Sequence, residues 1–177
     1  MSQKILVAYA TRHGTTAGVA EAIGNTLAEG GAHVDVLPME KVRDLTPYGS
    51  VVAGSAIRAG AWLPEAMQFM QSHRTELAQK RVAVFLVCMT LSMKADYRTH
   101  VATWLDPVRA IVRPVSEGLF AGALDISKVE SFGDRLKFRL SVLFGAWSEG
   151  DHRDWNAIHN WAESLRPLLI NKEAITS

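Results

Sequence analysis

Residues Ile5-Leu6-Val7-Ala8-Tyr9-Ala10-Thr11-Arg12-His13-Gly14-Thr15-Thr16 combine an apolar run with a short polar loop. The run is brief and continuous, as expected of a central parallel strand that is covered on both faces. After the loop, apolar residues recur at helical spacing, at Val19, Ala20, Ile23 and Leu27. This stretch therefore predicts a strand, a tight turn and a helix, in that order.

The polar loop has two possible roles. A helix N-terminus presents free N–H groups and a partial positive charge, and Thr11, Thr15 and Thr16 add hydroxyl groups, so the loop suits a phosphate. Gly14 would let the backbone approach that anion closely. Alternatively, Thr15 or Thr16 simply caps the helix. The GxGxxG and GxxxxGK[ST] patterns are both absent.

Composition indicates one globular domain spanning residues 1–177. The chain is 48% hydrophobic and 21% charged, and its net charge of +1 gives no field that would attract nucleic acid. A single cysteine, Cys88, excludes an internal disulfide and fits a reducing compartment. No apolar run is long enough to span a bilayer, and no signal peptide is expected, because the N-terminus leads directly into a predicted strand. We therefore expect a cytoplasmic protein.

No metal site is expected, because the remaining histidines have no ligand spacing. These are His33, His73, His100, His152 and His159.

Further apolar runs alternate with helical patterns along the chain. Strands are expected at residues 33–37, 50–54, 81–88 and 115–123. Strands that alternate with helices imply a parallel sheet, and five of them favour the doubly wound order 2-1-3-4-5. In that order ligands bind beyond the carboxyl ends of the strands, at the switch between the first and third. Here those ends carry the polar loop and a second unusual loop, Ser55 to Trp62.

Helix boundaries follow from capping residues. Gly30-Gly31 should end the first helix, Pro64 should lie in the first turn of another, and Asp106 should cap a helix that restarts at Pro107. Asp154 should cap a last helix, and residues 171–177 should fray. The inward face of that last helix is expected to hold Ile158, Trp161, Ala162, Leu165 and Leu168.

Residues 125–150 depart from the alternation and predict an insertion with an amphipathic helix. Its apolar residues occupy two sides: Leu136, Leu140, Leu143 and Trp147 on one, Phe138 and Val142 on the other. A helix that is apolar on two sides needs more than one neighbour. It is either packed on the domain or is a surface for a membrane, a partner or an apolar substrate.

Taken together, these motifs resemble the flavodoxin family. The loop Thr11–Thr16 is similar to that family's phosphate loop and departs from it at His13, where a hydroxyl residue is usual. The likeness runs from Lys4 to Leu169 and narrows to the menaquinone-dependent protoporphyrinogen dehydrogenases, long-chain flavodoxin-like enzymes of haem synthesis. It is carried by the loop, the late basic helix and the motifs Gly54-Ser55-Ala56-Ile57-Arg58-x-Gly60 and Ala121-Gly122-Ala123-Leu124.

The resemblance implies FMN as cofactor, with its phosphate in the first loop and its ring between two others. The implied binding residues are Thr11, Arg12, His13, Gly14, Thr15 and Thr16, then Ser55, Ala56, Ile57, Arg58 and Gly60, and finally Val87, Cys88, Met89, Thr90 and Leu91. Arg58 either stabilises an anionic reduced flavin or extends to the surface. Trp62 and Tyr97 either stack on the ring or belong to the core. Cys88 is expected to be an inert thiol.

Three functions are compatible with this sequence. The first is an FMN oxidoreductase of heme biosynthesis that oxidises protoporphyrinogen with a quinone, touching the inner face of the cell membrane through residues 134–147. The second is a flavodoxin-type electron carrier, against which the net charge of +1 argues, because such carriers tend to be acidic. The third is a receiver-like signalling domain, which is disfavoured because Tyr9-Ala10-Thr11 and Gly54-Ser55 lack the necessary acidic residues. No catalytic residue is assigned, and a homo-oligomer stays open.

Overall fold

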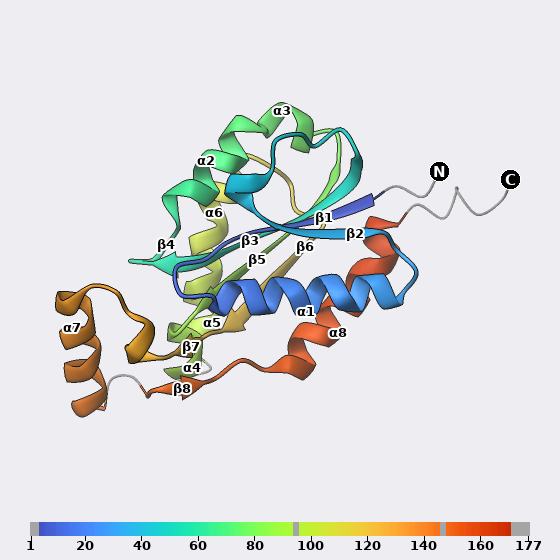
Figure 1. The fold of residues 1–177 in the computed structure, drawn as a ribbon. Helices are drawn as coiled ribbons and strands as arrows, with labels where there is room; N and C mark the ends of the chain where they lie inside the picture. The colour runs from blue at the N-terminus through green and yellow to red at the C-terminus, as the bar shows by residue number, and fades with distance from the viewer. Residues whose placement is uncertain (1–3, 94–95, 146–147, 171–177) are drawn as a thin grey trace, which may run out of the picture.

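The computed structural model describes residues 4–93, 96–145 and 148–170, and a twisted parallel sheet forms its centre (Figure 1). Its strands run side by side in the order β2-β1-β3-β5-β6, with every neighbouring pair parallel. They are β1 (Lys4–Ala10), β2 (Val34–Pro38), β3 (Tyr48–Arg58), β5 (Arg81–Cys88) and β6 (Ser116–Ala121). Since β4 is a short strand beside β3, this is the predicted doubly wound order, and the flavodoxin-like fold is confirmed.

Helices cover both faces of the sheet (Figure 1). One core contains apolar residues of α1 and α8, and the other contains residues of α2, α5, η2 and α6. The longer helices are α1 (Thr15–Glu29), α2 (Pro64–Ser72), α7 (Phe132–Leu143) and α8 (Trp155–Leu169). The shorter ones are η1 (Met39–Lys41), α3 (Arg74–Leu77), α4 (Thr90–Met93), α5 (Tyr97–Ala102), η2 (Thr103–Leu105), α6 (Asp106–Arg109) and η3 (Ile126–Lys128).

The third strand is longer than the sequence predicted. Ser55 and Ala56 continue to pair with β5, opposite Leu86 and Val87, so the expected loop is largely strand. The chain then turns at Ala59 and Gly60 and returns as β4 (Ala61–Trp62), antiparallel to β3. Positive φ values of 51° and 75° at the two turn residues suit a tight hairpin, whose twist matches that of its strands.

Two expected helix caps are wrong. Neither Thr15 nor Thr16 caps α1, because Gly14 is the N-cap, with φ 84°, and the helix starts at Thr15. Asp106 does not cap α6 either: the preceding η2 is already helical, so Asp106 is the first residue of α6 and pairs with Arg109 at 2.6 Å. By contrast, Gly30 and Gly31 end α1 as expected, and Pro64 begins α2.

In the insertion, a largely exposed helix lies between two short strands that pair with each other. The expected fifth strand stops at Ala121, and β7 (Ala123–Leu124) pairs separately with β8 (Gly150–Asp151). Between them, α7 projects from the sheet and buries none of its residues fully (Figure 1). One side of the helix touches the domain, since Phe138 and Val142 are half-buried, and the other apolar side, with Leu136, Leu140 and Leu143, is exposed. Trp147, expected on its apolar face, lies outside the described residues. Within the described ranges, no helix is long and apolar enough to cross a membrane.

The last helix, α8, begins as predicted and packs with one difference. The Asp154 carboxylate accepts a hydrogen bond from the Ala157 N–H and caps the helix. Leu168, expected to face inward, is 38% exposed, and Leu169 is buried in its place. The buried residues Ile158, Ala162, Leu165 and Leu169 keep regular helical spacing, so the same core face continues to Leu169. The predicted fraying of residues 171–177 lies outside the described part of the chain.

Candidate functional site

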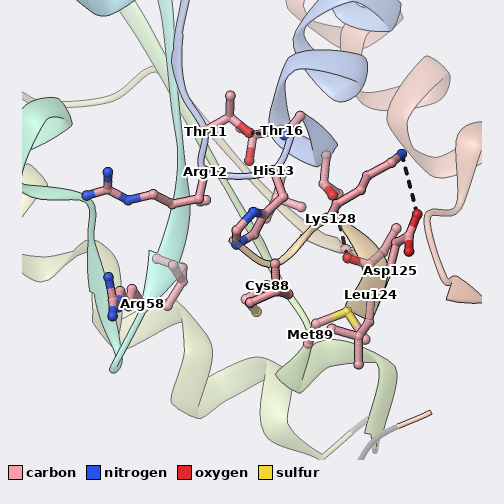
Figure 2. Close-up of a pocket in the computed structure, with 18 of the residues that line it drawn as sticks. Thr11, Arg12, His13, Thr16, Arg58, Cys88, Met89, Leu124, Asp125 and Lys128 are labelled. Atoms are coloured by element: carbon pink, nitrogen blue, oxygen red, sulfur yellow. Dashed lines mark hydrogen bonds and ion pairs between the residues drawn. The ribbon is translucent and has the colours of Figure 1, made fainter. Parts of the chain in front are cut away.

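A cavity of about 510 Å³ opens at the carboxyl ends of β1, β3 and β5, where the doubly wound order predicts a ligand site (Figure 2). Most of the residues expected to bind the cofactor line it: Thr11, Arg12, His13, Gly14, Thr15, Thr16, Ala56, Ile57, Arg58, Val87, Cys88 and Met89. The volume lies within the usual range for small-molecule sites, about 300–1,000 Å³. The structure therefore brings three separate segments of the chain to one pocket.

The loop between β1 and α1 has unused hydrogen-bond donors. The Thr11 hydroxyl accepts the Gly14 N–H at 3.1 Å, and the Thr15 hydroxyl donates to the Ala123 carbonyl at 3.5 Å. Thr16 is 1% exposed, and its hydroxyl has no hydrogen-bond partner among the residues that the structure describes. The first N–H groups of α1 also lack intrahelical acceptors. A buried orphan hydroxyl beside free N–H groups fits an anion such as a phosphate.

Four of the expected binding residues do not line the cavity. Ser55 is fully buried, and its hydroxyl accepts the Leu63 N–H at 3.0 Å, which ties the hairpin to the start of α2. Gly60 lies at the hairpin turn, where an added Cβ would be 3.3 Å from the Trp104 indole nitrogen. Thr90 and Leu91 begin α4, and Leu91 packs against the core.

Two aromatic residues considered for stacking on the ring lie elsewhere. Trp62 is 4% exposed within a core cluster, and Tyr97 is 37% exposed on α5. Neither lines the cavity. Trp62 is therefore a core residue, as the simpler interpretation held.

The insertion supplies a wall that the sequence analysis did not assign to the site. Its lining residues include Leu124, Asp125, Lys128, Val129, Glu130, Ser131, Asp134 and Phe138, and Arg153 follows from β8. These residues follow β6, whose carboxyl end lies at the same edge of the sheet, so the rule for doubly wound folds could have indicated them.

Charges at the pocket are more balanced than the loops alone suggested. Neither predicted ring loop contains a carboxylate, yet the insertion brings Asp134 to 3.7 Å from Arg58. Arg12 similarly lies 3.4 Å from Glu65, and both arginines project to the same side of the pocket (Figure 2). Arg58 is 67% exposed at its side chain, so it extends to the surface while still lining the cavity. Among described residues, no group of three His, Cys, Asp or Glu side chains could hold a metal.

Cys88 lies at the floor of the pocket, at the end of β5, and is 6% exposed (Figure 2). Burial raises the pKa of its thiol, and the nearby N–H groups of Leu91 and Thr90 oppose that rise. Since the thiolate is the reactive form, less of it is present at a given pH than for a free cysteine.

We expect iodoacetamide to alkylate Cys88 slowly, at a rate that keeps rising with pH after the rate for a free thiol has levelled off, because burial raises the pKa of the Cys88 thiol. Added FMN should slow the reaction further, because Cys88 lines the same cavity as the phosphate loop. Mass spectrometry of the labelled protein, with glutathione as reference, measures both rates. Labelling as fast as that of glutathione at pH 8 would contradict the buried position.

A known protein family matches most of this chain. The flavodoxin domain family matches residues 6–151. The chain belongs to the flavodoxin domain family. Flavodoxins bind FMN beyond the first and third strands, where this cavity lies. FMN is therefore the cofactor of this flavodoxin-domain protein, and the residues that hold it remain a prediction.

Solved flavodoxins share the fold. Flavodoxin 2 from Bacillus cereus is 27% identical, with a TM-score of 0.53, covering 81% of this chain and 98% of its own. A flavodoxin from the domain Archaea is 17% identical, with a TM-score of 0.54 and coverage of 93% and 96%. The flavodoxin from Streptococcus pneumoniae TIGR4 is 15% identical, with a TM-score of 0.57 and coverage of 92% and 97%. No curated protein matches the flavodoxin-domain chain.

Proposed function

We propose that this chain is an FMN-dependent oxidoreductase that oxidises protoporphyrinogen and passes the electrons to a quinone. The observation that supports this proposal is the extension of the cavity past the phosphate loop, between the β3–β4 hairpin and the insertion. That part of the wall combines apolar Ile57, Val129 and Phe138 with two cations, Arg58 and Lys128. These cations are ion-paired with Asp134 and Asp125 at 3.7 and 3.6 Å, and they would exchange these partners for the carboxylates of the donor. A donor with an apolar ring system and peripheral carboxylates matches both kinds of surface.

The residues of the chain bind and orient, while the cofactor supplies the redox chemistry. When bound, FMN would supply two-electron redox chemistry, so each turnover would move two electrons and two protons from the donor to the quinone. The threonine loop would hold the phosphate, and Ala56, Ile57 and Met89 would flank the ring. The cations would orient the carboxylates of the donor. This scheme requires no side-chain base.

The quinone would meet the protein at α7. Five large apolar residues at this helix are exposed: Phe132, Leu136, Leu140, Leu143 and Phe144. Leu143 and Phe144 are 77% and 81% exposed, and such contact of large apolar side chains with water is unfavourable. An apolar helix with nearby cations suits the surface of an anionic membrane, where quinones dissolve. The protein would then act at the inner face of the cell membrane.

The experiment compares quinone-linked oxidation of protoporphyrinogen, in lipid vesicles, by the wild type and by a Leu143→Ser/Phe144→Ser variant. We expect wild-type turnover, and at least a tenfold loss in the variant, because two exposed apolar anchors are removed. Val115→Ser, at an exposed apolar residue that precedes β6, is the control and should keep full activity. Equal turnover in all three proteins would reject the role of α7, and no turnover in any would reject the proposed reaction.

An electron carrier is the second candidate, and the identity of 27% to flavodoxin 2 over 81% of this chain favours it. A carrier should exchange electrons with a reductase at a rate that falls steeply with salt, because charged surfaces bring the partners together. The same preparation should then show no oxidation of protoporphyrinogen. Turnover of that donor with little dependence on salt would reject the carrier.

A further inference from the structure

We propose that Arg153, beside the first turn of α1, binds the phosphate of FMN. This inference rests on the proposed placement of the phosphate at the threonine loop. Arg153 lines the same cavity as that loop, and its Nη1 lies 3.4 Å from the Thr15 carbonyl oxygen. The residue thus joins the far end of the insertion to the first turn of α1.

A carboxylate and an aromatic ring hold the Arg153 guanidinium in place. Its Nε and Nη2 donate to the two carboxylate oxygens of Asp151 at 2.8 and 2.6 Å. Its central carbon lies 4.4 Å from the centroid of the Trp155 ring. The hydrogen bonds from Arg153 are the main reason that the pKa of Asp151 lies below its usual value. The Asp151 carboxylate therefore stays charged and holds the planar guanidinium of Arg153 in one orientation. A group fixed in this way loses little entropy when it meets an anion.

Gly18 leaves room for this arginine on the helix. A Cβ at Gly18 would lie only 2.7 Å from Nη1 of Arg153. Glycine inside a helix is less favourable than alanine. Glycine at position 18 therefore weakens α1 but leaves space for the Arg153 guanidinium beside the helix.

Arg153 is better suited to a buried phosphate than the other cations of the pocket. Its side chain is 18% exposed, against 46% for Arg12 and 67% for Arg58 and Lys128. Water screens exposed charges, so a partly buried cation interacts more strongly with an anion. A guanidinium has five N–H donors, and three hydrogen bonds are present here, which leaves two donors for phosphate oxygens.

The test compares two flavins that differ only in the phosphate. Apoprotein is titrated with FMN and with riboflavin, and quenching of flavin fluorescence gives each Kd. We expect Arg153→Gln to weaken FMN binding by about 10- to 100-fold and to change riboflavin binding less than about threefold, because a charged hydrogen bond is lost only with FMN. Arg153→Lys keeps the positive charge but not the planar guanidinium, so it should weaken FMN binding less than Arg153→Gln does.

Arg166→Gln is the matched control, at the other end of α1. Arg166 also holds a carbonyl of that helix, Thr26, and a carboxylate, Glu163, but does not line the cavity. Its replacement should leave the ratio of the two Kd values unchanged.

Three results would overturn the inference. Equal losses for both flavins in Arg153→Gln would show that Arg153 only supports the pairing of β7 with β8. If that variant does not fold, an unchanged ratio in Arg153→Lys rejects the contact. A wild-type protein that binds neither flavin rejects the proposed FMN site itself, and the inference with it.

Discussion

Thr16→Val is expected to weaken FMN binding by about 10- to 100-fold and, at the same time, to stabilise the apoprotein by about 1 kcal/mol. The Thr16 hydroxyl is buried without a partner among the described residues, so the apoprotein carries the cost of an unsatisfied polar group. A phosphate at the loop would accept its hydrogen bond. The two effects have opposite signs because the Thr16 hydroxyl gains a hydrogen-bond partner only when the anion is bound.

Calorimetric titration with FMN and thermal unfolding of the apoprotein measure the two effects separately. Thr26→Val is the control, since Thr26 is also buried in α1 but its hydroxyl donates to the Ala22 carbonyl at 2.9 Å. That variant should lose stability and keep its affinity for FMN. Unchanged affinity in Thr16→Val would show that its hydroxyl does not bind the phosphate.

Gly54→Ala is expected to destabilise the fold by about 1–3 kcal/mol, as overpacking of a tight core does. Gly54 lies in β3 opposite Phe85 of β5, and an added Cβ would be 2.0 Å from the ring. Phe85 is fully buried and packs against Phe120 and Trp161, so the ring has little room to move. The strand pair would have to separate, or the aromatic cluster would have to rearrange.

Urea unfolding of the wild type and the variant gives this difference from the two midpoints. Gly133→Ala provides the control, because Gly133 is in the first turn of α7 and its nearest neighbouring atom is the Ser131 hydroxyl, at 3.9 Å from the added Cβ. That change should be neutral or slightly stabilising. A neutral Gly54→Ala would mean that the packing around Phe85 is looser than the structure shows.

The sequence predicted the sheet well because each central strand is a short apolar run between turn residues. Arg81–Cys88 matched its predicted bounds, since all its residues except Arg81 are buried. The β3–β4 hairpin was missed because Ser55 and Ala56 are small residues that carry little strand signal. What extends β3 is pairing with β5, a contact between distant residues.

Local capping patterns were less reliable where tertiary structure competes with them. Threonine is a good N-cap, yet Gly14 takes that position in the left-handed conformation, and Thr16 is a buried residue of the first turn. Asp106 followed by proline suggested a helix start, but η2 already sets helical backbone before it. The capping prediction at Asp154 was confirmed, since an extended residue does precede α8.

About half of the pocket could be predicted from sequence. The loop Thr11–Thr16 is contiguous, so its residue types indicated a phosphate. For the opposite wall, the doubly wound rule points only to the chain after β6, and no local pattern shows which of residues 124–138 line the cavity. Arg153 shows most clearly what the sequence could not predict. In the sequence it is an isolated charged residue, and only the pairing of β8 with β7 brings it next to α1.

The most direct test of the central claim is the absorption spectrum of the purified protein, followed by identification of the flavin that acid releases. A loop that binds a phosphate dianion beside a ring site predicts a yellow protein that releases FMN, or a colourless one that turns yellow with added FMN. A colourless protein that takes up no FMN would contradict the account, from the role of Thr16 to that of Arg153.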